Sequence, residues 1–136
     1  MKKILIIVEK GRGGHYNVFS PKTEFTLLNG QGATVENAIF DMKEALQEVI
    51  ESYLENGEEI HSELRGNIEF EYKYDVASLF NYFAVINLSS FARKNGMNES
   101  LLRKYKNGLA FASEKQCRKI ESALHRLGHS LCAASL

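Results

Sequence analysis

The segment IEFEYKYDVASLF, residues 68 to 80, changes its periodicity part-way along. Up to Tyr74 apolar and charged side chains alternate strictly, which predicts a β-strand with one apolar face and one charged face. Asp75 follows, a residue type that commonly caps helices, and the apolar residues then recur at helical spacing. We therefore predict a domain boundary here, between residues 1–74, which contain strands, and residues 75–136, which are helical.

Upstream of this boundary the sequence predicts further strands and one long helix. The strands are expected at the β-branched run 3–9, at residues 15–20 after a glycine-rich turn, and at residues 25–29. From Val35 the apolar residues step by three and four, which predicts an amphipathic helix that ends near Asn56. The order of elements is therefore β-β-β-α-β, and the fold class is α+β with an all-α domain at the C-terminus.

Downstream of the boundary the apolar spacing is helical almost to the C-terminus. Gly96 and Gly108 interrupt this spacing, and Ser113 followed by Gln116 forms a capping-box pattern. Gly128 is expected to end the last helix. The helices are predicted at about residues 76–86, 88–95, 99–107 and 114–127.

The chain of 136 residues has no net charge, but its charges are unevenly distributed. Residues 1–75 hold eight Lys and Arg against fourteen Asp and Glu, whereas residues 76–136 hold nine against three. A basic module beside an acidic one is typical of a protein that binds a polyanion with the first and a basic partner with the second. Two modules that attract each other would give the same distribution.

The basic stretch FARKNGMNESLLRKYKNG, residues 91 to 108, has the spacing of two short helices that cross steeply. Such a pair needs a small residue where the helices touch, a glycine in the turn, and apolar residues that face back into the core. Ala92, Gly96, Leu102 and Tyr105 meet these needs. The remaining side chains at the start of the second helix are then expected to face outward, where they could contact base edges; they are Asn98, Glu99, Ser100, Arg103 and Lys104.

With the following Lys106-Asn107-Gly108 and the segment SEKQCRKIESAL, residues 76 to 128 resemble the Cro/Xre-type helix-turn-helix family. The resemblance implies that the five outward residues contact the DNA major groove and that Ser89, Lys106 and Asn107 bind backbone phosphate. Asn95 departs from the family pattern, because an apolar residue is usual at its position. The alternative is that the cations of these helices form solvated faces.

The N-terminal part resembles the HicB family of antitoxins from toxin-antitoxin systems. Two motifs carry the resemblance: Glu9, Gly13, Gly14, Tyr16, Val18 and Pro21 in the first, and Gly32, Ala38, Glu44 and Ala45 at the start of the long helix. The resemblance implies a partial RNase H-like fold in residues 1–74 that binds and blocks a HicA-like RNA-cleaving toxin. It also implies that the C-terminal domain represses the operon. The segment Lys22-Thr23-Glu24-Phe25 departs from the family pattern.

Other functions stay open at this point. The N-terminal module of a transcriptional regulator could sense a ligand or another protein, with no toxin involved. A two-metal nuclease would need several converging carboxylates, and Glu9, Glu44, Glu48 and Asp75 could be nominated, but nothing in the sequence brings them together. We therefore expect no catalytic residue, metal or cofactor, and we interpret His125 and His129 as a solvated pair.

We further expect a cytoplasmic protein that forms homodimers or higher oligomers. No apolar run has membrane-spanning length, and the first residues resemble a buried strand more than a signal peptide. The segment VASLFNYFAVINL, residues 76 to 88, carries apolar side chains around more of a helix than one small domain easily buries. Part of this segment is therefore a candidate dimer contact.

Overall fold

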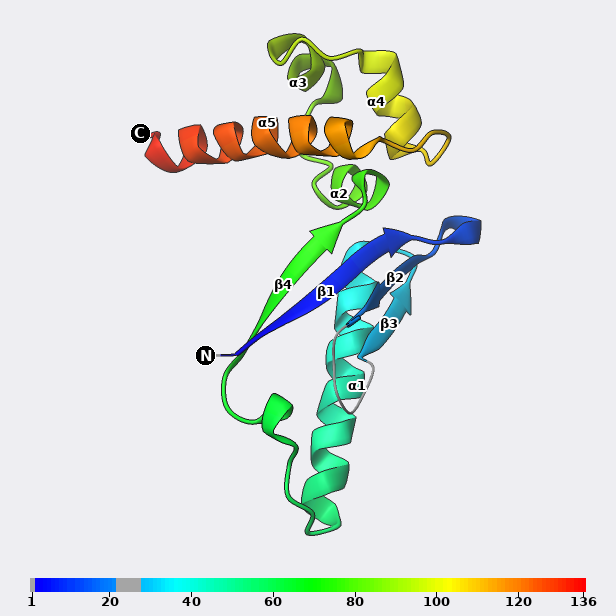
Figure 1. Cartoon of the computed structure of the whole chain (residues 1–136), viewed down its shortest axis with the longest axis vertical. Helices are drawn as coiled ribbons and strands as arrows, with labels where there is room; N and C mark the ends of the chain where they lie inside the picture. The colour runs from blue at the N-terminus through cyan, green and yellow to red at the C-terminus, as the bar shows by residue number, and fades with distance from the viewer. Residues whose placement is uncertain (1, 22–27) are drawn as a thin grey trace. The chain divides into compact units, whose positions relative to one another are not determined.

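The computed structural model describes residues 2–21 and 28–136, and its contacts divide the chain into two compact units (Figure 1). The first unit is Met1–Phe83 and the second is Ala84–Leu136. The division therefore falls after Phe83, whereas the sequence predicts a boundary at Asp75. The charge separation is the same for either boundary, because residues 76–83 contain no charged side chain.

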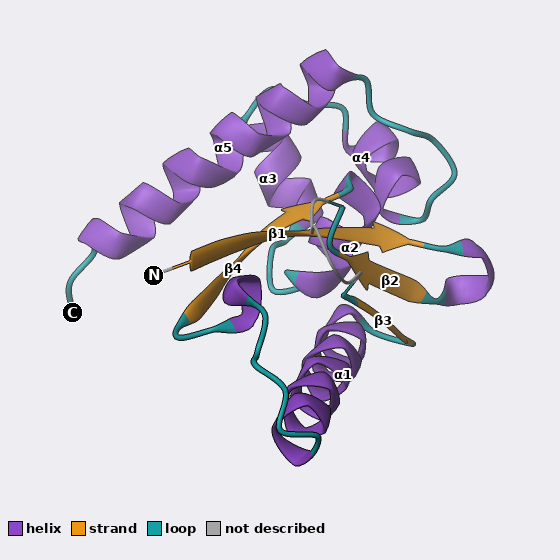
Figure 2. Ribbon diagram, turned by 60° about the horizontal axis from the view of Figure 1, so that its bottom comes forward, coloured by secondary structure: helices purple, strands orange, loops and turns teal. Residues whose placement is uncertain are grey.

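A four-stranded mixed sheet forms the centre of the first unit (Figure 2). Its strands are β1 (Lys2–Lys10), β2 (Tyr16–Phe19), β3 (Asn29–Gly32) and β4 (Ile68–Tyr74), in the spatial order β3-β2-β1-β4. Strands β1, β2 and β3 are joined antiparallel, and β4 pairs with β1 in parallel. The α+β class and the strand at 68–74 are thus confirmed.

The third strand lies further along the chain than predicted. We expected it at residues 25–29, and the described strand β3 begins only at Asn29. Residues 25–27, together with the segment Lys22-Thr23-Glu24 that departs from the HicB pattern, lie outside the described residues.

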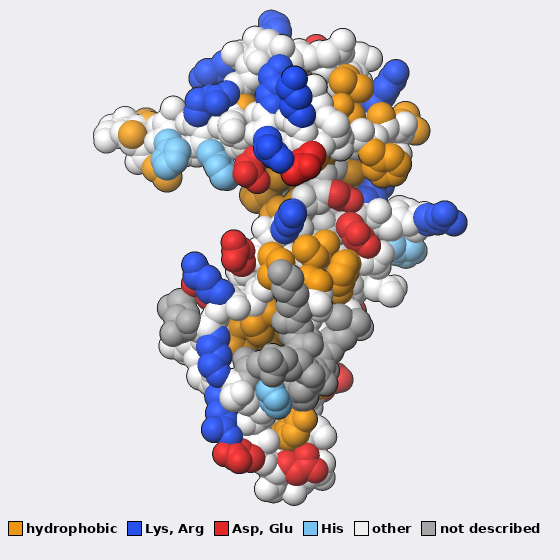
Figure 3. Space-filling view, in the orientation of Figure 1, with side chains coloured by type: hydrophobic (Ala, Val, Ile, Leu, Met, Phe, Trp, Pro, Cys, Tyr) orange, Lys and Arg blue, Asp and Glu red, His pale blue; other side chains and the backbone are white. Residues whose placement is uncertain are grey.

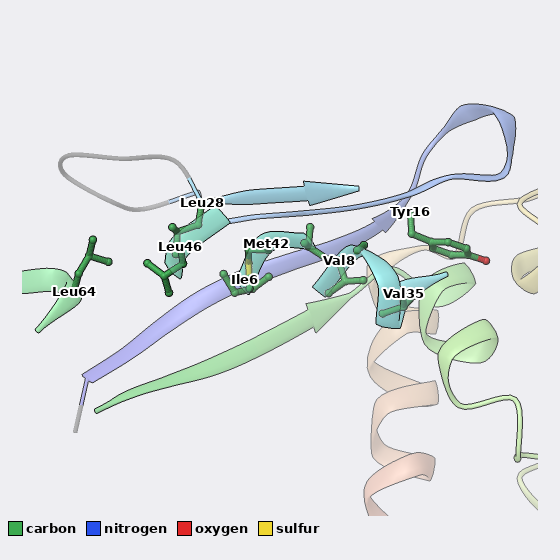
Figure 4. Packing of buried hydrophobic residues seen from close by; sticks show 10 residues of the cluster. Ile6, Val8, Tyr16, Leu28, Val35, Met42, Leu46 and Leu64 are labelled. Atoms are coloured by element: carbon green, nitrogen blue, oxygen red, sulfur yellow. The ribbon is translucent and has the colours of Figure 1, made fainter. Parts of the chain in front are cut away.

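The long helix α1 (Val35–Glu55) packs on one face of the sheet, and the side chains between them form the core (Figure 4). Thr34 caps the helix by accepting a hydrogen bond from the Asn37 N–H at 3.1 Å. Strand β3 can approach α1 closely because it has glycine where side chains would clash. The fully buried side chains of this core are those of Ile6, Val8, Val18, Ala38 and Met42.

Helix α2 (Val76–Tyr82) belongs to the first unit, because it packs against β1, β4 and α1. Asp75 caps it, as predicted: one carboxylate oxygen accepts from the Ser78 N–H at 2.7 Å. The other oxygen accepts from the Lys10 N–H at the end of β1. Within the candidate dimer segment Phe80 is fully buried, so it is not available for a dimer contact in this structure.

The second unit contains α3 (Leu88–Lys94), α4 (Glu99–Lys106) and α5 (Glu114–Ala133). Their starts agree with the predicted ones, and Ser113 caps α5 by accepting from the Gln116 N–H. The prediction that Gly128 ends the last helix is wrong, because α5 continues to Ala133. Among the described residues no helix is both long enough and apolar enough to span a membrane.

Candidate nucleic-acid interface

Helices α3 and α4 are joined by a short turn whose geometry depends on Gly96. Gly96 has a φ of 62°, in the left-handed region that glycine adopts without strain. The Met97 N–H donates to the Ala92 carbonyl at 2.8 Å and the Gly96 N–H to that of Arg93 at 3.4 Å, which together form a Schellman motif. Ala92 itself is buried. Gly96 thus supplies the positive φ of the turn, and Ala92 is a small buried residue on α3 whose carbonyl accepts one of its hydrogen bonds.

Helix α4 begins directly after this turn, with Asn98 as its cap. The Asn98 side chain accepts a hydrogen bond from the Leu101 N–H at 3.0 Å. Leu102 and Tyr105 are buried, as expected for the side of the helix that faces the core of the unit. The opposite side is polar: Asn98, Ser100, Arg103 and Lys104 are exposed, and Glu99 is half-buried.

Three of the predicted DNA-contacting residues are hydrogen-bonded to one another across the two helices. The Ser89 hydroxyl, on α3, donates a short hydrogen bond to Glu99. Arg103 donates to the Glu99 carboxylate at 2.6 Å and to the Ser89 hydroxyl at 3.1 Å. This network fixes the Arg103 guanidinium at the surface between α3 and α4, in a conformation set before any ligand is present.

The network also stabilises the charged form of Glu99. The hydrogen bond from Ser89 and that from Arg103 lower the pKa of Glu99 below its ordinary value, and the charge of Arg93 acts in the same direction. Arg93 is a member of the cluster that the sequence analysis missed. The available signal was its position four residues after Ser89 on α3, whose carbonyl accepts from the Arg93 guanidinium at 3.4 Å.

The side chain of Asn95 has hydrogen-bond partners at both its amide nitrogen and its amide oxygen. Its amide nitrogen donates to the Phe91 carbonyl at 2.9 Å, and its amide oxygen accepts from Arg126 on α5 at 3.3 Å. The polar residue therefore links α3 to α5 instead of leaving an unpaired group. Nothing in the local sequence pairs Asn95 with Arg126, which lies 31 residues further on.

The end of α4 holds the remaining predicted phosphate ligands. Asn107 is the C-terminal cap of the helix and is exposed, and Lys106 is half-buried beside it. Gly108 has a φ of 72°, and the Leu109 N–H then donates to the Lys104 carbonyl at 2.9 Å. Ser89 lies on α3, beside the start of α4 rather than its end.

Several Lys and Arg side chains lie on the visible face of this unit (Figure 3). Ala84–Leu136 contains nine Lys and Arg and three Asp and Glu, and two of the three acids are paired within the unit. Glu99 binds Arg103, and Glu114 binds Arg118 on α5. Lys104 has no ion pair among the described residues, so its charge on the exposed side of α4 is available to a polyanion.

The carboxylates that could be nominated for a nuclease share no contact with one another. Both oxygens of Asp75 accept backbone hydrogen bonds, and Glu44 and Glu48 lie exposed on α1. In the part of the chain that the structure describes, no group of three His, Cys, Asp or Glu residues is arranged to hold a metal ion.

An open depression of about 300 Å³ lies on the first unit. It is bordered by the start of α1 and the end of α2, and its walls are both polar and apolar. The residues that line it include Tyr16, Thr34, Glu36, Asn81 and Tyr82.

Comparison with known proteins gives no match: no family model, no curated protein and no solved structure is similar to this chain. The interpretation of both units therefore rests on their residues and geometry.

Proposed function

We propose that the chain is an antitoxin that also represses transcription of its own operon. Its second unit binds operator DNA as a helix-turn-helix domain of Cro/Xre type. Its first unit is a HicB-like module with a partial RNase H-like fold, which binds a small basic RNA-cleaving toxin and blocks it.

The observation that carries the DNA-binding proposal is the exposed polar side of α4, which follows directly on the turn at Gly96. A recognition helix contacts base edges with the residues of its first turns, and here these are Asn98, Ser100, Arg103 and Lys104. Arginine and asparagine donate to the acceptors that guanine and adenine present in the major groove. The excess of six positive charges in the unit supplies the phosphate attraction that such a domain needs.

The link between Glu99 and Arg103 gives this surface a defined geometry. Because Glu99 holds the guanidinium beside α4, little side-chain entropy is lost when Arg103 contacts a base. Arg103 can donate to Glu99 and to a base at the same time, since a guanidinium has five N–H groups. Glu99 then serves as a positioning residue for Arg103 or accepts from a cytosine amino group itself.

The acidic surface of the first unit supports the toxin-binding part of the proposal. This unit has fourteen acidic and eight basic residues, and five glutamates of α1 are exposed: Glu36, Glu44, Glu48, Glu51 and Glu55. Such a surface attracts a basic protein and matches the cationic groups with which an RNA-cleaving protein binds its substrate. The element order β-β-β-α-β and the sheet order β3-β2-β1-β4 are consistent with the proposed fold.

The DNA-binding proposal can be tested by selection from a random duplex library with the full-length chain. We expect one enriched sequence, and we expect that it also occurs upstream of the chain's own coding sequence. The double variant Asn98→Ser with Ser100→Ala should lose the enrichment, because both exposed side chains lie at the start of α4 and serine at position 98 still caps the helix. Binding with no sequence preference would contradict the assignment of α4 as a recognition helix.

A second candidate, a regulator that senses a small molecule, is favoured by the open depression beside α1 and α2. Co-expression with the adjacent genes separates the two functions. A small basic protein that co-purifies in fixed stoichiometry, and whose RNA cleavage the chain suppresses, supports the antitoxin. Sequence-specific DNA binding without any such protein supports the regulator, and a ligand search at the depression would follow.

A further inference from the structure

Strand β4 forms an open edge of the sheet. The strand order is β3-β2-β1-β4, and in the described part of the chain no strand pairs with the outer side of β4 (Figure 2). β4 is seven residues long and contains no proline. Long unpaired edges invite pairing with another chain, and soluble proteins usually protect them with proline, bulges or charged side chains. The charged side chains of β4 carry both signs, so a partner strand with a matching charge pattern can still pair with this edge.

Half of the backbone groups of β4 point to this open edge. The Asp75 N–H donates to the Val8 carbonyl at 3.0 Å, and the Asn67 carbonyl accepts from the Lys2 N–H at 3.2 Å. Odd-numbered residues thus bond to β1, so even-numbered residues direct their N–H and C=O groups outward. These even-numbered residues are Ile68, Phe70, Tyr72 and Tyr74.

The side chains of β4 divide into two kinds. Those of the even-numbered residues lie on the face of the sheet that α1 covers, where they remain half-buried. The rings of Phe70 and Tyr72 are 6.3 Å apart and those of Tyr72 and Tyr74 6.4 Å apart, so they form a row along the strand. The odd-numbered residues Glu69, Glu71 and Lys73 are exposed on the other face.

We propose that β4 pairs antiparallel with β4 of a second copy of this chain, with the two-fold axis at Glu71. The two sheets then join into one continuous sheet of eight strands. Glu69 lies opposite the partner's Lys73, and Lys73 lies opposite the partner's Glu69. Phe70 lies opposite the partner's Tyr72 in a hydrogen-bonded pair, and this contact also occurs twice.

Charge complementarity selects this register over its neighbours. An axis at Phe70 would place Glu69 opposite the partner's Glu71, and this acid pair would occur twice. An axis at Tyr72 would place Glu71 opposite the partner's Lys73 twice, but it would also place Glu69 opposite the partner's Asp75 twice, which leaves two pairs of like charges. A register shifted by one residue would turn the aromatic row to the wrong face. The axis at Glu71 leaves a single pair of like charges, between Glu71 and the partner's Glu71.

This dimer surface goes beyond the proposed function, because it depends neither on DNA nor on a toxin. It lies wholly within Met1–Phe83. A failure of DNA binding would leave it untouched, and a failure of β4 pairing would leave the assignment of α4 untouched.

Disulfide trapping in the full-length chain tests the register. Cys117 and Cys132, both exposed and unpaired, are first replaced by serine. Glu71→Cys is then introduced, because a residue on the two-fold axis faces itself in a non-hydrogen-bonded pair, with Cα atoms about 4.5 Å apart. Glu69→Cys is the matched control: it is also exposed and on the same face, but its copy in the partner lies about 14 Å away.

With oxidised glutathione as the oxidant, we expect Glu71→Cys to form a covalent dimer about tenfold faster than Glu69→Cys, because only the first places the two thiols within bonding distance. Equal rates for the two variants, or no covalent dimer of Glu71→Cys, would overturn the proposal. The second of these results is also what an edge reserved for a different protein would give.

Exchange of the charges provides an independent check on the same surface. Lys73→Glu places acids opposite each other twice, and we expect it to raise the dissociation constant of the dimer about tenfold in sedimentation equilibrium. The double variant Glu69→Lys with Lys73→Glu restores both opposite-charge pairs and should restore the dissociation constant. A double variant that dissociates as readily as Lys73→Glu would overturn the register.

Discussion

Glu99 connects the two helices of the candidate DNA-binding surface through a single carboxylate. It accepts from Ser89 on α3 and from Arg103 on α4, and both hydrogen bonds favour its charged form. The pKa of Glu99 is therefore lower in the folded chain than its ordinary value of 4.5. A lowered pKa of an acid stabilises the folded state above the unfolded pKa, and this stabilisation is lost as the pH falls through the folded pKa.

We accordingly predict that Glu99→Gln reduces the acid sensitivity of the fold. At about pH 7 the variant should unfold at a lower urea concentration than the wild type, and the difference should shrink towards about pH 3. Glu121→Gln, which removes an exposed carboxylate of α5, controls for the change in net charge. A constant difference between Glu99→Gln and the wild type over this range would contradict the assigned network.

Tyr74 provides a second prediction at the scale of one residue. Burial, with smaller contributions from Tyr82 and Tyr72, raises the pKa of Tyr74 to about 12. Since the unfolded phenol has a pKa of 10.0, its contribution to stability is complete below pH 10 and is lost as the pH rises towards 12. We expect Tyr74→Phe to lose less stability between these values than the wild type. The pKa of Tyr74 itself follows from the difference between the titration curves of the wild type and Tyr74→Phe. A pKa near 10 in this difference would contradict the burial described for the ring.

At the scale of elements, the contact between β3 and α1 depends on glycine. A Cβ atom at Gly30 would lie 2.6 Å from the Met42 backbone nitrogen and would also clash with the Ala38 carbonyl, so backbone atoms would have to move. We predict that Gly30→Ala lowers the free energy of unfolding by about 2 kcal/mol or more. The measurement is urea unfolding.

Gly128→Ala is the matched control for this substitution. Gly128 lies within α5, and a Cβ atom added there would meet open space, so alanine should raise the free energy of unfolding by up to about 1 kcal/mol. Equal effects of Gly30→Ala and Gly128→Ala would show that β3 does not approach α1 as closely as described.

Elements with a clear period were predictable from the sequence, and their ends were less so. The alternation in IEFEYKY and the amphipathic pattern after Val35 gave β4 and α1 nearly at their bounds. Gly128 did not end α5, because it does not take the positive φ with which glycine commonly ends a helix. The cap at Asp75 was predictable. The second hydrogen bond of Asp75, which it accepts from the Lys10 N–H, was not, because the two residues are 65 positions apart in the sequence.

At the scale of the whole molecule, the sequence shows that two units differ in charge, but it does not show where one unit ends. Helix α2 follows the cap at Asp75, where the pattern changes, so it is expected with the later helices. In the structure it packs on β1 and β4. Those contacts join segments far apart in the sequence, and periodicity carries no information about them. The exposed side of α4 was predictable because it follows from the buried positions of Leu102 and Tyr105.

DNA binding by α4 is the central claim, and Lys104 tests it most directly, since its charge is exposed and has no ion pair among the described residues. The full-length chain is titrated against a labelled duplex from upstream of its coding sequence, at several salt concentrations. We predict that Lys104→Ala weakens binding by about 1–3 kcal/mol. Lys119→Ala, an equally exposed lysine of α5, should change it far less. Equal affinities and salt slopes for Lys104→Ala and the wild type would contradict the claim.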